Sequence, residues 1–495
     1  MGRSLSVEHR FRYRAERIPA LGLGLSVDVY SPDLFELIRS FEGRIHHPTY
    51  LEIFRATPKA LQAVRAQDAT VPLPYHGEGL WVTQPDFSTT SFFEQELDAV
   101  AEQLAILQSP WLNHECATKQ MAGYTFGTYL PPLYTAESAK VVADNIRLVQ
   151  ERLDQVASAH EAVGPLFLLE LPPLTYFMAG TISIPQFFRS VSDHVDCGLV
   201  LDIGHLWSVY RYSEAKNEIA LEAFVEQFLD EFPVERIVEI HVAGLARHES
   251  ISSHHDEGTM PQWLDAHAAP IQPVSLSMLE QVLAHPRLVS LRAVALEVDT
   301  KPIGNIIEEF EDVSDRFGPT VRRVVARSDQ GRGLGCKKFD EFTLEPLMVG
   351  DDARKRLREA YARYAKVVSG QISPIGSEWE DVRRDSKGLR RYIREYLPYE
   401  ILHWGGDIAE MFPETCIGLR EEGVALDDIV PWWFCTAETL DRPYDFFLLK
   451  IDRVLGFVAA RAPQLLAQAV EEAQLLRLGY AEANDAVRPV MESTR

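Results

Sequence analysis

Six short apolar runs in this 495-residue chain each end on a side chain that can bind a metal ion or carry a proton. The central run covers residues 199–201 and is followed by Asp202 and, three residues later, by His205. The other five runs end on His76, His114, Glu170, His241 and Glu297. Unbroken runs of leucine and β-branched residues are typical of buried parallel strands. We therefore expect the polar residue after each run to lie at the C-terminal tip of a strand.

These residue types predict a metal centre with several ions. Histidine, aspartate and glutamate are ligands for zinc, manganese and iron, and a carboxylate can bridge two ions. Neighbouring strand tips lie about 5 Å apart, so one ion can be shared by His76, His114 and Glu170. A second ion would be held by Glu170, Asp202, His241 and Glu297, with Glu170 as the bridge. A third would use His205 together with Asp265 and His267 from a long polar insertion.

Each of these residues also has a simpler explanation when it is taken alone. A single histidine on an apolar strand is more often a hydrogen-bonded core residue, and Asp265 and His267 can be solvated loop residues. His254, His255 and Asp256 lie nearby and are alternatives to that pair. Six successive tips that carry an acid or an imidazole nevertheless favour metal binding, because buried carboxylates without cations would strongly destabilise the fold.

The elements that must position these residues alternate between strand and helix. The predicted strands are 21–29, 50–54, 71–76, 111–114, 166–170, 199–202, 236–241 and 293–297. Helical periodicity separates them, for example over 92–106 and from Thr135, the predicted N-cap, through 162. Eight such units predict an α/β fold, a (β/α)8 TIM barrel, whose active site lies at the C-terminal ends of the strands.

The chain divides into a predicted barrel domain at 1–316, a linker at 317–343 and a helical C-terminal domain at 344–495. Arginines and the glycines 331, 333 and 335 mark the linker. A phosphate-binding loop is the poorer interpretation, because no strand precedes these glycines and no Gly-Lys-Ser/Thr follows. Residues 431–434, Pro-Trp-Trp-Phe, are either ordinary core or a peptide-recognition patch.

Composition narrows the partners and the compartment. A formal net charge of −24 disfavours nucleic acid as a partner. No run reaches the ~18 apolar residues of a membrane span, and the N-terminus lacks the apolar core of a signal peptide. Five cysteines without CxxC spacing suit a reducing compartment. We therefore expect a cytoplasmic protein that binds neither membrane nor nucleic acid.

Four segments give a family resemblance over about residues 18–305: 76–80 (HGEGL), 130–137 (LPPLYTAE), 240–244 (IHVAG) and 265–270 (DAHAAP). In them the chain resembles the multinuclear non-heme iron-dependent oxidative enzymes, which include the oxazolone-forming enzyme of methanobactin biosynthesis. The resemblance implies a xylose isomerase-like barrel with two or three irons. It implies as ligands or near-ligands His76, His114, Glu170, Asp202, His241, Asp265, His267 and Glu297.

The resemblance also implies an activity: oxidation by dioxygen of a side chain, often cysteine, in a ribosomally made precursor peptide. The peptide would be recognised by a partner protein or by the C-terminal domain in its place. The chain departs from the family pattern at Gly204-His205, where the family commonly has paired asparagines, and at Ser26, where a basic residue is common.

The His205 departure makes the predicted site similar to the trinuclear zinc site of endonuclease IV-type barrels. A zinc or manganese hydrolase, or a sugar isomerase, is therefore the alternative enzyme class. A non-catalytic, metal-stabilised binding module is a third interpretation.

Overall fold

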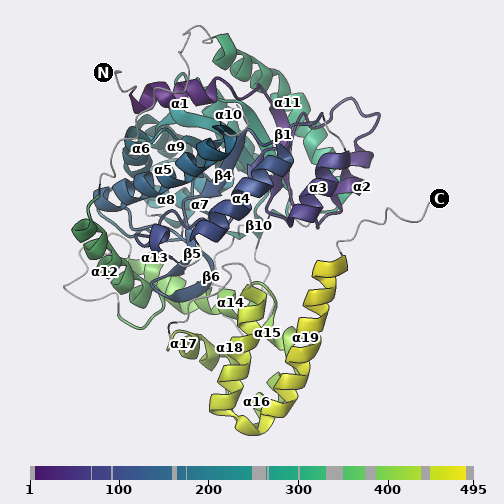
Figure 1. Cartoon of the computed structure of the whole chain (residues 1–495), viewed down its shortest axis with the longest axis vertical. Helices are drawn as coiled ribbons and strands as arrows, with labels where there is room; N and C mark the ends of the chain where they lie inside the picture. Colours follow the sequence, from purple (N-terminus) through teal and green to yellow (C-terminus); the bar gives the residue numbers. More distant parts are fainter. Residues whose placement is uncertain are drawn as a thin grey trace.

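The computed structural model describes residues 6–67, 70–90, 93–158, 164–173, 176–213, 215–247, 263–264, 267–298, 301–330, 349–373, 386–435, 437 and 446–486. Eight parallel strands close into a barrel in the order β1-β12-β9-β8-β7-β4-β3-β2 (Figure 1). Their bounds are β1 Gly22–Val27, β2 Leu51–Phe54, β3 Tyr75–His76, β4 Trp111–Glu115, β7 Leu166–Glu170, β8 Gly198–Asp202, β9 Ile237–Ala243 and β12 Ala293–Val298. Each predicted strand is present, and the predicted TIM barrel is confirmed.

Helices follow the strands and cover the barrel (Figure 1). They are α2 Leu34–Ser40, α3 Pro58–Gln67, α4 Phe93–Leu107, α5 Ala136–Ser158, α6 Ile184–His194, α7 Ile203–Tyr212, α8 Ala215–Glu218, α9 Leu221–Glu231, α10 Pro273–Leu283 and α11 Ile303–Gln330. Thr135 caps α5, because its Oγ1 accepts a hydrogen bond from Ser138 N at 3.1 Å. This agrees with the predicted N-cap.

The N-terminal end of the barrel is closed by α1 (Val7–Ala15). Phe11 and Ala15 of this helix pack in one buried cluster with Trp111, Leu168 and other residues of the barrel interior. Apolar side chains thus fill this end of the barrel, whereas active sites of such barrels lie at the other end, the C-terminal end of the strands.

A β-hairpin at the C-terminal end of the strands was not expected from the sequence. β5 (Thr118–Met121) and β6 (Tyr124–Leu130) pair antiparallel between β4 and α5. A second small antiparallel pair joins β10 (Ala246–Arg247) to β11 (Trp263–Leu264).

The C-terminal region is helical, as predicted, and lies on the hairpin side of the barrel (Figure 1). Its helices are α12 Asp351–Val368, α13 Ser386–Arg391, α14 Leu397–His403, α15 Ile408–Met411, α16 Pro413–Glu421, α17 Ile429–Trp433, α18 Phe446–Arg461 and α19 Leu466–Ala486, with a π-helical segment, Tyr392–Tyr396, between α13 and α14.

The aromatic residues of the 431–434 segment lie mainly in the core of this region. Trp433 and Phe434 are fully buried, and Trp433 Nε1 donates to Thr125 O of the hairpin at 2.9 Å. Hairpin residues Met121 and Phe126 belong to the same buried cluster. Of the two interpretations of this segment, ordinary core is therefore the one that holds for Trp433 and Phe434.

The predicted domain division stays a prediction. Residues 317–330, the first part of the predicted linker, continue α11, while 331–348 lie outside the described residues. Among the helices of the described residues, none has the length and apolar character needed to cross a membrane.

Candidate metal centre

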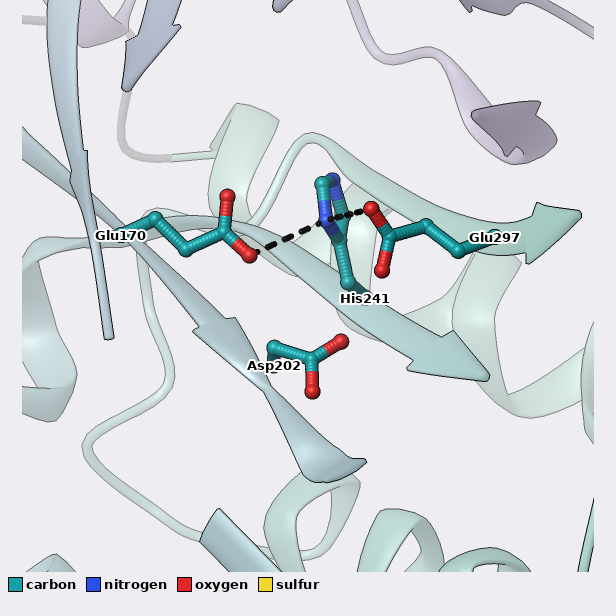
Figure 2. A group of neighbouring side chains, drawn as sticks. All are labelled: Glu170, Asp202, His241 and Glu297. Carbon is teal, nitrogen blue, oxygen red and sulfur yellow. Dashed lines mark ion pairs between the residues drawn. The ribbon is translucent and has the colours of Figure 1, made fainter. Parts of the chain in front are cut away.

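Four buried side chains converge at the C-terminal ends of four neighbouring barrel strands. They are Glu170 of β7, Asp202 of β8, His241 of β9 and Glu297 of β12, and each offers one ligand atom within 4.8 Å of the others. Figure 2 shows the Glu170 and Glu297 carboxylates turned towards the His241 ring from opposite sides, with Asp202 beside them. His241 Nδ1 lies 3.4 Å from Glu170 Oε1 and 3.3 Å from Glu297 Oε1. The structure thus brings together the set predicted for the second ion.

Strand register pairs some of these residues directly. Asp202 pairs with His241 across β8 and β9, and Glu170 pairs with Glu115 across β7 and β4. Asp202 also caps α7, because its Oδ1 accepts a hydrogen bond from His205 N at 2.6 Å. The strand-to-helix junction therefore fixes the orientation of this carboxylate.

His76, Glu115 and Asn113 extend the group on the other side of Glu170. His76 Nε2 lies 3.2 Å from Glu170 Oε2 and 3.8 Å from Glu115 Oε1. Asn113 Nδ2 donates to Glu170 Oε2 at 2.6 Å. Glu170 is therefore contacted from both sides, as expected of a bridging carboxylate.

His114 makes no ion pair with this group among the described residues, but its Nε2 is buried and has no hydrogen-bond partner there. His114 Nδ1 lies 2.9 Å from the carbonyl oxygen of Glu115, and its ring packs edge-on against Trp81. Side chains alternate along a strand, and on β4 the residues that reach barrel partners are Trp111, Asn113 and Glu115. Glu115 thus joins this group, and His114 as a ligand stays a prediction.

The set predicted for the third ion is partly described. His205 Nδ1 lies 2.7 Å from Leu171 O and 3.7 Å from Glu170 Oε1. His267 Nε2 lies 3.6 Å from Glu297 Oε2. Asp265 and its alternatives His254, His255 and Asp256 lie outside the described residues.

Two further carboxylates lie deeper in the barrel, against the other nitrogen of His241. Its Nε2 is 3.0 Å from Glu52 Oε2 and 3.5 Å from Glu239 Oε2. Glu52 is held by Ser26 Oγ at 3.0 Å and Trp111 Nε1 at 3.1 Å. Ser26, which replaces a basic residue of the family pattern, thus orients a carboxylate that in turn orients a candidate ligand.

The electrostatics show a centre crowded with negative charge. Burial acts to lower the pKa of His76, but Glu115 and Glu170 outweigh it and raise that pKa to about 10. Burial acts to raise the pKa of Glu170, yet His241 and His76 hold it well below its ordinary value. Burial raises the pKa of Glu115 to about 7. Protons thus neutralise part of this charge in the metal-free protein.

The donor set fits bound cations. Glu115 Oε2, Glu297 Oε2 and His241 Nδ1 are buried and have no hydrogen-bond partner among the described residues. Such atoms are costly unless something satisfies them. Imidazoles mixed with carboxylates, and without thiolates, suit iron, zinc or manganese.

A comparison with known protein families identifies the family to which the protein with this candidate metal centre belongs. The model of the family described as RiPP precursor modification enzyme MbnB/TglH/ChrH matches residues 21–316. RiPP denotes a ribosomally synthesised and post-translationally modified peptide. The chain belongs to this MbnB/TglH/ChrH family.

Curated relatives agree with the extent of this match. A UPF0276 protein of Psychromonas ingrahamii is 23% identical over 290 residues, which cover 58% of this chain and 91% of the relative. A UPF0276 protein of Paraburkholderia phytofirmans is 26% identical over 200 residues, which cover 40% of this chain and 57% of the relative. The chain therefore spans just over half the length of the second relative.

Two solved structures are similar to part of this chain. An endonuclease IV from Thermus thermophilus is 15% identical, with a TM-score of 0.35 over 61% of this chain and 99% of that one. A xylose isomerase-like TIM barrel/4-hydroxyphenylpyruvate dioxygenase fusion protein is 13% identical, with a TM-score of 0.36 over 62% of this chain and 45% of the other.

In this MbnB/TglH/ChrH member, the hairpin adds polar groups beside the centre that the sequence analysis missed. Tyr129 OH donates to Glu78 Oε1 at 2.9 Å, Lys119 pairs with Glu78, and the Lys119 ammonium lies 4.4 Å from the Tyr129 ring centroid. The His76-Gly77-Glu78 motif had drawn attention to Glu78. Its partners Lys119 and Tyr129 lie on β5 and β6, which no sequence periodicity predicted.

Proposed function

We propose that this protein is a multinuclear iron-dependent oxidase or oxygenase that modifies a side chain, cysteine by preference, of a ribosomally made precursor peptide. The observation that carries the proposal is the buried Glu170, Asp202, His241 and Glu297 cluster at the barrel mouth of a peptide-modifying family. Barrels of this kind carry their active sites at that end.

Each candidate ligand has a place in this proposal. Glu170 would bridge two ions, because its two oxygens face His76 on one side and His241 on the other. His76, His114 and Glu115 would complete one position, and Asp202, His241 and Glu297 the next. His205 and His267, with Asp265, would hold a third ion.

When bound, iron would supply the one-electron steps that couple oxidation of the side chain to reduction of dioxygen. The chain's own residues would hold this chemistry in place. Asn113 fixes one Glu170 oxygen, and Glu52 fixes the His241 ring. The ring of Phe54, centred 5.1 Å from that of His76, and Trp81 place apolar surface around the centre and limit the access of water.

The test compares metal and oxygen requirements directly. Protein loaded with iron under nitrogen would be mixed with candidate cysteine-bearing peptides from short open reading frames beside its gene, then exposed to air or kept anaerobic, and the peptide masses measured. We expect a mass change only with both iron and dioxygen, and none in a Cys→Ser peptide or with the Asp202→Asn enzyme.

The competing enzyme class gives the opposite result. Turnover of the peptide, a sugar or a phosphodiester by the zinc or manganese form, at equal rates with and without dioxygen, would replace the oxidase proposal by the hydrolase or isomerase class.

A further inference from the structure

One helix of the C-terminal region carries a strongly basic surface on an otherwise acidic protein. α12 has six lysine or arginine residues and three acidic ones, in a chain with a net charge of −24. Five of the six are exposed, and we call them the α12 basic face: Lys355, Arg356, Arg358, Arg363 and Lys366. Asp351 and Asp352 lie on the same side of the helix in its first turn, and Glu359 lies among the five basic residues.

The spacing of these residues puts them on one side of the helix. At 100° per residue they span about 160° of the helix circumference. The opposite side carries Leu357, Tyr361, Tyr364 and Val368, all buried in the core of the C-terminal region. The basic face is therefore the solvent side of a firmly packed helix.

α12 is fixed to the mouth side of the barrel. Tyr364 OH donates to Pro131 O at 3.2 Å, and Tyr361 OH lies 3.0 Å from Ser138 Oγ. Pro131 directly follows β6, and Ser138 lies in the first turn of α5, on the C-terminal side of the barrel strands. Figure 1 shows α12 below the barrel, at the edge where β5 and β6 emerge.

The charges of the basic face are mostly uncompensated. Arg356 pairs with Glu137 at 2.9 Å, but no ion pair of Lys355, Arg358, Arg363 or Lys366 is found within the described residues. These four neighbouring cations, which have no ion-pair partner among the described residues, create a local positive potential that attracts an anionic segment and repels cationic ones.

We propose that the α12 basic face binds an acidic segment of the peptide substrate and so tethers it beside the metal centre. This inference rests on the proposed function for the identity of the ligand. Lys355 and Lys366 lie about 16 Å apart along the helix, a length covered by about five extended peptide residues. A nucleic acid would extend beyond this face onto acidic surface, so a short acidic peptide fits better.

The experiment measures binding without turnover. The probe is a fluorescein-labelled peptide of ten alternating Glu and Gly residues, followed by anisotropy with the full-length metal-free chain at low and moderate salt. We expect binding that weakens as salt rises, and weaker binding of a matched Gln-Gly peptide.

Charge reversal locates the binding surface. Lys355→Glu/Arg358→Glu/Arg363→Glu should weaken binding by at least about tenfold, because three attractive charges become repulsive. The matched control is Arg322→Glu/Arg323→Glu/Arg327→Glu, which reverses three exposed arginines of α11. We expect less than about a twofold change there.

Several outcomes would overturn the inference: equal binding by the α12 variant and wild type, an equal loss in the α11 control, or tighter binding of a 20-residue uridine RNA or of phosphatidylglycerol vesicles than of the acidic peptide. The assay needs neither metal nor oxygen, and Asp202→Asn should bind the probe as wild type does. Failure of the oxidase proposal would therefore leave this result unchanged.

Discussion

Glu170 is the residue on which the other candidate ligands converge. His76, His205 and His241 approach its carboxylate, and Asn113 donates to it. A carboxylate with 1% exposure among three imidazoles is stable only while positive charge surrounds it. In the metal-free protein protons supply that charge, and bound ions would take their place.

His76 gives this exchange a measurable pH dependence. Because its pKa in the folded chain is raised to about 10, its contribution to stability is complete below the unfolded pKa near 6.5 and is lost as pH rises through 10. The stability gap between metal-free wild type and His76→Gln should therefore narrow by on the order of 2 kcal/mol between pH 6.5 and 10.

Urea unfolding of both proteins at several pH values measures this gap. His47→Gln, at an exposed position, serves as the control for loss of a histidine. A gap for His76→Gln that stays constant across the window would show that His76 carries no extra proton.

At this scale the sequence predicted most of the cluster, since an acid or imidazole after an apolar run marks a strand tip. It did not single out Glu115, the neighbour of His114 on β4. These neighbours face opposite sides of β4, and a fully buried strand has no polar face that would show which side of it faces the barrel interior. Glu52 was less visible, because only the closed barrel brings β2 close to His241, and Glu239 lies inside an apolar run, two residues before His241 on β9.

The β5–β6 hairpin is the element that joins the centre to the C-terminal region. One set of its side chains, Lys119 and Tyr129, reaches Glu78 beside the centre. Another, Met121 and Phe126, packs into the C-terminal core. Its position therefore depends on both parts of the molecule.

Gly127 tests how tightly the hairpin is held. Its φ is +79°, and a Cβ there would lie 2.3 Å from Phe446 Cζ. Gly127→Ala should lower the free energy of unfolding by about 2–4 kcal/mol, from left-handed backbone strain and overpacking together.

Gly423→Ala separates the effect of left-handed backbone strain from that of overpacking. Gly423 has a φ of +73° and nothing within 4 Å of the added Cβ. We expect a loss of about 1 kcal/mol there, measured by the same denaturant titration. Equal losses for the two variants would mean that Phe446 moves aside freely.

The barrel strands were predictable because each is an apolar run with a clear end, whereas the hairpin was not. Residues 118–130 mix glycine, threonine and lysine with aromatics, and the partners that bury them lie more than 250 residues away in α17 and α18. α11 likewise continues through an arginine-rich stretch that we had predicted to be a linker. It stays helical there because Val321, Val324 and Val325, on its other face, are buried.

At the scale of the whole molecule, one of the buried contacts between the barrel and the C-terminal region lies at Arg354 of α12. Arg354 Nη1 donates to Asn145 Oδ1 at 3.2 Å and to Pro85 O at 3.3 Å, and its Nη2 lies 3.4 Å from Asp144 Oδ2. Asp144 and Arg354 are both buried, so each charge depends on the other for compensation.

Arg354→Met should therefore destabilise the chain by about 3 kcal/mol, because it leaves Asp144 without its buried cation. The control on the same helix is Arg358→Met at an exposed position, where we expect a change within about 0.5 kcal/mol. Equal denaturation midpoints for the two variants would indicate that the α5–α12 contact does not hold the two regions together.

The central claim, that the barrel mouth is a multinuclear metal centre, is tested most directly by metal content. The chain would be reconstituted with ferrous iron under nitrogen, desalted, and assayed for bound iron, zinc and manganese per chain. We predict about two or three ions in wild type and about one or none in Glu170→Gln, which loses the bridging carboxylate. Wild-type protein that is folded yet retains less than about one ion, with Glu170→Gln unchanged from it, would contradict the account.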